Sequence, residues 1–133
     1  MTTPTTPALA LSLDVVVLDC PDPAALADFY ARLLGWPPPS GEDVDLGEGW
    51  VNLRNPAGGV GLAFQRAADY QAPTWPDPTR PQMFHLDLAV TDLPAAREHA
   101  LAAGARTLDV SPEHATFQVY ADPAGHPFCL CAC

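Results

Sequence analysis

Hydrophobic and polar positions divide the chain into short elements that recur in a second half. Residues 11–18 are mostly leucine and valine, which predicts a strand buried on both faces. Beyond Pro21 the apolar residues recur at three- and four-residue spacing, which predicts an amphipathic helix between an N-cap at Asp22 and a left-handed C-cap at Gly35. The apolar positions of this helix are Leu26, Phe29, Tyr30, Leu33 and Leu34.

Three short strands are predicted after this helix. They cover 44–46, 50–54 and 60–66, and Asn55-Pro56-Ala57-Gly58 between the last two is a hairpin turn. The first half is therefore expected to have the order β-α-β-β-β. Residues 67–82 contain Tyr70, Trp75 and several prolines, which indicates a stiff connector without regular structure.

The same order returns after the connector. The pattern predicts a strand over 84–91, an N-cap at Asp92 and a helix over 93–103 that ends at Gly104. Three further strands are predicted over 106–110, 116–121 and 127–132.

Two pairs of matching positions indicate an internal repeat. Asp22 corresponds to Asp92, and the turn at 55–58 corresponds to Asp122-Pro123-Ala124-Gly125, at nearly the same spacing. We therefore expect a flexible N-terminal tail at 1–10, followed by a single domain at 11–133. The domain comprises module one at 11–66, the connector at 67–82 and module two at 83–133.

Charge and cysteine content limit the possible partners. The net charge is −10 with only six basic residues, all of them arginines, so a nucleic acid would be repelled. No apolar run approaches the roughly 20 residues that span a bilayer, and no membrane association is expected. The cysteines are not spaced as a disulfide framework, which favours a cytoplasmic location (Cys20, Cys129, Cys131, Cys133).

Three segments resemble the glyoxalase and bleomycin-resistance group of the vicinal-oxygen-chelate superfamily. They are VVVLDCPDPAALADFYARLLGW, RPQMFHLDLAVTDLPAAREHALAAGA and FQVYADPAGHPFCL. The resemblance implies an α+β fold in which two tandem βαβββ modules form a curved mixed sheet that closes a cup. It also implies a small-molecule ligand and a homodimer, but the superfamily supports several reactions, so function must be argued from the site.

Members of the superfamily that use a metal place one ligand on the first and one on the last strand of each module. The repeat puts the first-strand positions at Val15 and His85, and counting from each hairpin glycine puts the last-strand positions at Leu62 and Cys129. Val15 and Leu62 carry no lone pair, and a cysteine sulfur is a soft donor. No metal cofactor is therefore expected, although a divalent metal is possible, with His85 and Cys129 as the residual candidates.

The strand faces that would line the cup supply the other candidates. The expected ligand-binding residues are Val15, Val17, Leu62, Phe64, Trp75, His85 and Cys129. His85 and Asp87, two positions apart on one strand face, are the candidate catalytic pair. The competing interpretations are that His85 is a hydrogen-bonded structural residue and that the cysteines are small buried hydrophobes.

Three functions are compatible with these residues. The first is a glyoxalase-like protein that binds a small organic molecule in its cup, either without catalysis or as a metal-independent enzyme. The second is a metal-dependent lyase, isomerase or dioxygenase with an altered metal site, in which Asp87 or Asp19 joins His85. The third is a drug-sequestering protein of the bleomycin-binding type, whose acidic surface attracts cationic antibiotics. If the chain is an enzyme, the resemblance implies a lyase or isomerase of the glyoxalase kind.

Overall fold

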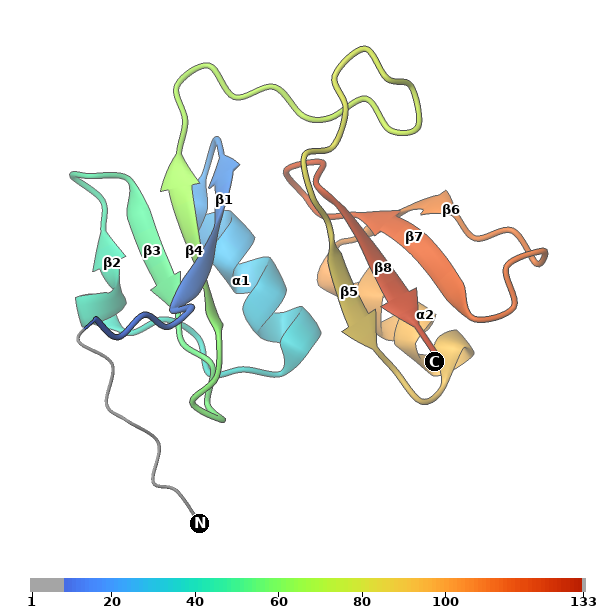
Figure 1. The fold of residues 1–133 in the computed structure, drawn as a ribbon, viewed down its shortest axis with the longest axis horizontal. Helices are drawn as coiled ribbons and strands as arrows, with labels where there is room; N and C mark the ends of the chain where they lie inside the picture. The colour runs from blue at the N-terminus through green and yellow to red at the C-terminus, as the bar shows by residue number, and fades with distance from the viewer. Residues whose placement is uncertain (1–8, 133) are drawn as a thin grey trace.

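The computed structural model describes residues 9–132, which form two modules of the predicted β-α-β-β-β order (Figure 1). Most of the tail predicted at 1–10, and Cys133, lie outside the described residues. The connector predicted at 67–82 contains no helix or strand, as expected.

Module one is a four-stranded mixed sheet with one long helix. Strand order is β1-β4-β3-β2, with β1 parallel to β4 and the other neighbours antiparallel. A short 3-10 helix, η1, was not predicted. The elements are β1 (Val15–Cys20), α1 (Pro23–Leu34), η1 (Gly41–Asp43), β2 (Val44–Asp45), β3 (Trp50–Leu53) and β4 (Gly61–Arg66).

Module two repeats this topology. Strand order is β5-β8-β7-β6, and β5 is parallel to β8. The elements are β5 (Leu86–Ala89), α2 (Leu93–Ala103), β6 (Arg106–Asp109), β7 (Phe117–Ala121) and β8 (Pro127–Cys131). The fold class predicted from sequence is therefore confirmed, with strands generally shorter than expected.

Both predicted helix caps of module one are present. The Asp22 carboxylate accepts a hydrogen bond from the Ala25 backbone N–H at 3.2 Å, and Gly35 ends the helix with φ of 69°. Asp92 caps α2 in the same way. The strand predicted over 11–18 instead begins at Val15, because its partner β4 begins opposite at Gly61 and no strand continues beside residues 11–14.

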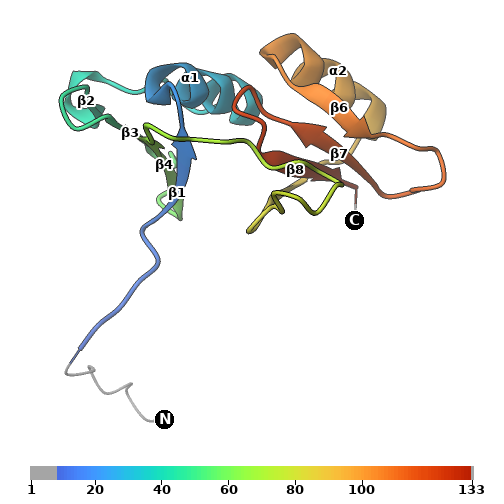
Figure 2. The same cartoon turned by 90° about the horizontal axis from the view of Figure 1, so that it is seen from above.

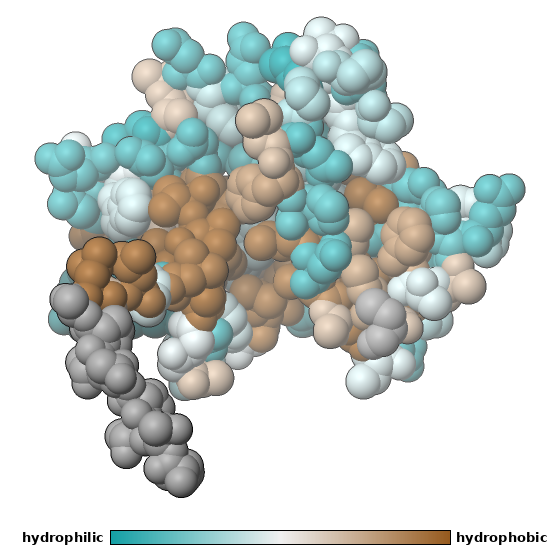
Figure 3. Space-filling view, in the orientation of Figure 1, coloured by the Kyte–Doolittle hydropathy of each residue, from teal (hydrophilic) through white to brown (hydrophobic). Residues whose placement is uncertain are grey.

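The two sheets are not joined into a closed cup, which corrects that part of the prediction. Each is a separate four-stranded sheet, and no strand pairing connects them among residues 9–132. Both helices lie on the same side of the sheets, so the opposite faces stay open (Figure 2). Apolar side chains gather near the centre of this open side, with polar side chains around them (Figure 3).

Helix α1 connects the modules through the core. Tyr30 stacks on Phe64 of its own sheet, with ring centroids 5.7 Å apart, and meets Phe128 of module two edge-on at 6.4 Å. The Tyr30 hydroxyl donates to the buried Asp122 carboxylate at 2.6 Å. Two residues further along the same helix, the Arg32 guanidinium donates to the Ala103 carbonyl oxygen at 2.8 Å. These contacts fix one module against the other.

The connector is held against the hairpin that precedes β8. The Tyr70 hydroxyl donates to the Ala124 carbonyl oxygen at 2.7 Å. Gly125 has φ of 92°, and a Cβ atom there would lie 2.6 Å from the Cβ atom of Ala72. Only glycine therefore allows the connector to approach this hairpin so closely.

Candidate functional site

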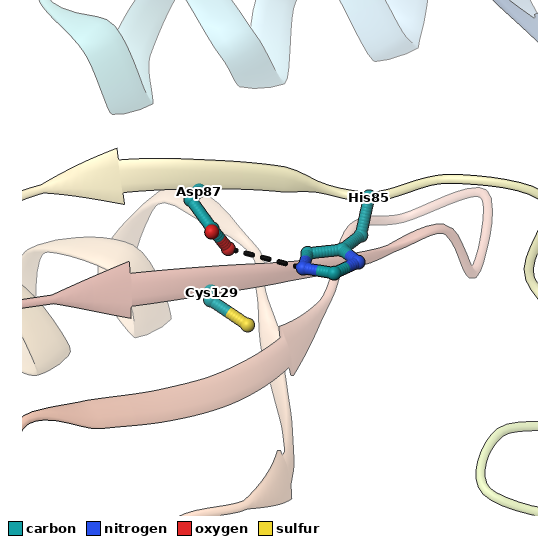
Figure 4. Close-up of side chains that lie close together, drawn as sticks. All are labelled: His85, Asp87 and Cys129. Atoms are coloured by element: carbon teal, nitrogen blue, oxygen red, sulfur yellow. Dashed lines mark ion pairs between the residues drawn. The ribbon is translucent and has the colours of Figure 1, made fainter.

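Module two brings three chemically active side chains together on its open sheet face (Figure 4). Asp87 of β5 lies beside Cys129 of β8 in the parallel register, and His85 immediately precedes β5. The His85 Nε2 atom is 3.1 Å from Asp87 Oδ1, and the ligand atoms of all three residues lie within 4.8 Å of one another. The structure thus assembles three of the residues that the sequence singled out.

Strand alternation explains why these side chains share a face. Leu86 and Leu88 of β5 pack against the core, so His85 and Asp87 project from the opposite face. The side chains of His85 and Asp87 are 40% and 61% exposed, respectively. Solvent and small molecules can therefore reach the cluster.

Cys129 is held in its thiol form. Burial, the nearby negative charge of Asp87 and a hydrogen bond with that carboxylate raise the pKa of Cys129 to about 12. Because the thiolate is the nucleophile, Cys129 is unreactive at neutral pH. The other two ionisable side chains of the cluster are those of His85 and Asp87.

A cavity of about 860 Å³ lies between the two modules under the connector. Val17 and Asp19 of β1 and Gln65 of β4 form one wall. The connector and the adjoining module-two segments supply Tyr70, Arg80, Phe84 and His126. The cavity therefore combines apolar and aromatic surface with a few polar groups.

The polar end of this cavity is ordered by hydrogen bonds between the modules. The His126 Nε2 atom donates to the Asp19 carbonyl oxygen at 2.6 Å and lies 3.3 Å from the Tyr70 hydroxyl. Burial, followed by the negative charges of Asp122, Cys20 and Asp19, raises the pKa of Tyr70 to about 12. Tyr70 is therefore a neutral donor at physiological pH.

The predicted cup residues fall into separate places. Val17 lines the cavity between the modules, whereas Val15 lines a separate pocket of about 430 Å³ at the β3–β4 hairpin, beside Leu62. Trp75 is half-buried in the connector, outside the residues that line the larger cavity. Phe64 and most of Leu62 are buried in the core on the helix side, so these two side chains do not face the open side of the sheet.

A one-residue difference between the hairpins explains the placement of Leu62 and Phe64. Val17 pairs with Ala63 in module one, as Asp87 pairs with Cys129 in module two. Ala63, rather than Leu62, therefore corresponds to Cys129, because the first hairpin has one more residue after its turn glycine. A slip of one residue along a strand moves a side chain to the opposite face.

Several cavity residues were not chosen from the sequence. His126 could have been found, because it lies in the DP-x-GHPF segment that carried the resemblance. Gln65 follows from the corrected register, two positions beyond Ala63 on the same face. Asp19 lies two positions beyond Val17 on the same strand face, and the sequence suggested it only as a substitute metal ligand. Arg80 had no such signal, since its position depends on how the connector folds back.

The residues do not fit a metal centre with ligands from both modules. Val15 and Ala63, at the first- and last-strand positions of module one, carry no donor atom. Module two offers His85, Asp87 and Cys129, a set that mixes a soft sulfur with nitrogen and oxygen. A four-ligand, oxygen-rich site of the kind implied by the resemblance is therefore not supported by these residues.

Comparison with known proteins agrees with the architecture. Two tandem β-α-β-β-β modules define a protein of the vicinal-oxygen-chelate class. The model of the glyoxalase-like domain matches residues 15–131, and the chain belongs to this family. No curated protein matches the sequence. No helix among residues 9–132 is long and apolar enough to cross a membrane.

Solved structures share the fold at low sequence identity. A glyoxalase/bleomycin resistance protein/dioxygenase family enzyme from Burkholderia phytofirmans PsJN is 17% identical, with a TM-score of 0.68 over 90% of this chain and 97% of that chain. TnmS3, an antibiotic-binding protein from Streptomyces sp. CB03234, is 17% identical, with a TM-score of 0.58 over 95% and 98% of the two chains. The oxidase ChaP-H2 is 19% identical, with a TM-score of 0.55 over 92% and 93%.

Proposed function

We propose that this protein binds a small organic molecule in the cavity between its modules and does so without the four-ligand metal centre. The cavity itself carries the proposal. Its volume of about 860 Å³ is within the range of roughly 300–1,000 Å³ that is usual for sites of drug-sized ligands.

The chemistry of the walls supports an amphipathic ligand. Val17 and Phe84 offer apolar contact on opposite sides, and Gln65 and His126 offer polar groups near the connector. An apolar wall with a few fixed polar groups binds a ligand through burial and orients it through hydrogen bonds. If the bound molecule is transformed, the proposed acid–base pair is His85 and Asp87, and the reaction is a lyase or isomerase step. These two residues are not among those that line the cavity, but His85 directly follows the wall residue Phe84 in the chain.

Filling the cavity tests this function. In a thermal-shift screen of small aromatic and aliphatic acids, amines and amides, some compounds should raise the melting temperature of the wild-type protein. Val17→Phe should weaken the binding of each stabilising compound by at least about tenfold, or about 1.4 kcal/mol. Val60→Phe, on the exposed hairpin outside the cavity, is the control and should bind normally. The absence of any ligand, or equal binding by both variants, would contradict the proposal.

A metal-dependent lyase, isomerase or dioxygenase is the second candidate, favoured by the proximity of His85, Asp87 and Cys129. It requires that chelation abolish an activity and that His85→Ala remove the bound metal. An activity that survives both treatments would exclude it.

Drug sequestration is the third candidate, favoured by the net charge of −10 and by Asp19 and Asp69 on the cavity wall. The fold shared with an antibiotic-binding protein is consistent with it. Affinity for a cationic drug should then fall as ionic strength rises, whereas affinity for an uncharged ligand should barely change.

A homodimer and a reducing, cytoplasmic location remain part of the proposal. Light scattering tests the first, and cell fractionation tests the second.

A further inference from the structure

We propose that the pocket at the β3–β4 hairpin is a second binding site, which takes a small zwitterion such as a free α-amino acid. This pocket has a volume of about 430 Å³ and lies at the end of module one where β1 begins. The residues that line it are all different from those that line the cavity between the modules. The proposed function therefore does not depend on this site, and the two can be tested separately.

Arg54 supplies a positive charge to the pocket wall. Its guanidinium Nε atom donates to the Asp43 carboxylate at 2.7 Å, and the Asp43 side chain is only 7% exposed and accepts from the Ser40 backbone N–H at 3.0 Å. The guanidinium is therefore anchored through Nε, but its Nη groups have no protein partner among residues 9–132. Because the Arg54 side chain is 70% exposed, a carboxylate can reach these groups and accept two hydrogen bonds.

Asp14 supplies a negative charge to the same wall. It lies directly before β1, and its backbone oxygen accepts a hydrogen bond from the Gly61 N–H at 3.0 Å, which fixes the position of the residue. Within the described part of the chain, its carboxylate forms no ion pair. The hydrogen bond and charge of Asp43, followed by the charges of Glu42 and Asp14, raise the pKa of Arg54. Asp14 and Arg54 are thus close enough to interact electrostatically, without direct contact.

A zwitterion can use both charges at once. Its carboxylate would accept hydrogen bonds from the Arg54 Nη groups, and its ammonium group would donate to the Asp14 carboxylate. A simple anion would be repelled by Asp14 and by the net charge of −10, and a simple cation would be repelled by Arg54. Only a molecule that carries both charges makes two favourable contacts here.

The rest of the wall favours a small, polar ligand. Leu53 and Leu62 line the pocket but are only 1% and 6% exposed, so they offer little apolar surface. The Asn52 Oδ1 atom accepts from the Trp50 Nε1–H at 3.0 Å, which leaves the amide N–H groups of Asn52 for the carboxylate of a ligand. A large apolar molecule therefore gains little in this pocket.

Three matched compounds test the need for both charges at pH 7. L-Alanine carries a carboxylate and an ammonium group, N-acetyl-L-alanine keeps only the carboxylate, and L-alaninamide keeps only the ammonium group. In NMR titrations of the ¹⁵N-labelled wild-type protein, L-alanine should bind saturably and move the amide signals of Asn52, Arg54 and Gly59. Each of the other two compounds should bind at least about tenfold more weakly, because it loses a hydrogen-bonded charge pair. No saturable binding of L-alanine, or equal binding of all three compounds, would overturn the proposal.

Two variants with matched controls test the residues. Asp14→Asn and Arg54→Gln should each weaken L-alanine binding by at least about tenfold. Asp28→Asn and Arg106→Gln make the same charge changes at exposed positions outside the pocket and should bind normally. Arg54→Gln also removes the ion pair with Asp43, so Asp14→Asn is the variant that disturbs the fold least.

Asp14→Asn also makes a prediction about selectivity. The preference for L-alanine over N-acetyl-L-alanine should shrink in this variant, because the repulsion of the anion and the attraction of the ammonium group are both removed. Unchanged affinity in Asp14→Asn, or an unchanged preference, would overturn the site.

The wild-type titration also distinguishes this pocket from the cavity between the modules. L-Alanine should leave the amide signals of Gln65 and His126 unmoved, because both residues line the cavity. Changes centred on these two residues would assign L-alanine to the cavity and overturn the second site. A failure of the second site leaves the proposed function intact, because binding in the cavity is measured with other compounds and with Val17→Phe.

Discussion

The hydroxyl of Tyr30, in module one, donates a hydrogen bond of 2.6 Å to the carboxylate of Asp122, in module two. Both side chains are buried, and the second oxygen of Asp122 accepts from the backbone N–H groups of Ala124 and His126. One carboxylate therefore fixes the hairpin before β8 and attaches it to α1. Burial raises the pKa of Asp122 and that of Tyr30, so the hydroxyl stays protonated as the donor.

Removing this hydroxyl should destabilise the protein. Tyr30→Phe keeps the ring contacts but leaves a buried Asp122 oxygen without its donor, which costs about 1–3 kcal/mol of unfolding free energy. Tyr120→Phe is the control, because the Tyr120 hydroxyl donates to Gln118, which is only partly buried. This variant should lose less unfolding free energy than Tyr30→Phe. Urea unfolding measures both. Equal losses would show that the contact between modules has no special role.

The connector approaches Gly125 closely, so replacing this glycine should cost more stability than replacing a glycine with free space around it. Gly125→Ala combines a positive φ with a Cβ contact of 2.6 Å to Ala72, whereas Gly58→Ala combines a similar φ of 82° with no atom within 4 Å. Gly125→Ala should therefore lose at least about 1 kcal/mol more, the usual cost of overpacking. Thermal unfolding compares them, and Ala72→Gly should partly restore Gly125→Ala. Equal stabilities would mean that the connector does not pack against the hairpin.

The ionised carboxylate of Asp43 should make the stability of the protein depend on pH. Hydrogen bonds from the Ser40 backbone N–H and the Arg54 guanidinium lower the pKa of Asp43. A carboxyl group with a lowered pKa stabilises the fold above its ordinary pKa, and this contribution is lost as pH falls through the folded-state value. Asp43→Asn should therefore be less stable than wild type at pH 7, and the difference should shrink in acid. A difference that does not change with pH would contradict this assignment.

The reactivity of Cys129 should report the neighbouring Asp87 carboxylate. With its pKa raised to about 12, Cys129 should react with iodoacetamide at pH 8 far more slowly than an ordinary cysteine. Asp87→Asn removes the negative charge but not the burial, so the rate should rise several-fold and still remain slow. Peptide mapping by mass spectrometry follows the rate at this residue. A fast reaction in the wild-type protein would contradict the thiol assignment.

Local signals in the sequence were sufficient for the elements and their order. Asp22 and Gly35 end α1 where capping chemistry placed them, because a cap needs only its neighbours in the chain. The first four residues of the strand predicted over 11–18 are not part of β1, for the opposite reason. A strand needs a partner, and β4 offers none before Gly61.

The candidate site was only partly predictable for the same reason. His85 and Asp87 share a face through strand alternation, which can be counted along the sequence. Cys129 joins them through the β5–β8 register, which the repeat indicated. Leu62 and Phe64 were placed on the wrong side because a single extra hairpin residue shifts the register. Arg80 reaches the cavity only because the connector folds back, which no local pattern in the sequence indicates.

Chemical-shift mapping on ¹⁵N-labelled protein tests the central claim, that the ligand lies between the modules, most directly. Titration with a compound from the thermal-shift screen should move the amide signals of Gln65, Tyr70, Phe84 and His126, which come from both modules and the connector. Val17→Phe should suppress these changes. Shifts confined to one module, or changes that persist in Val17→Phe, would contradict binding in the cavity.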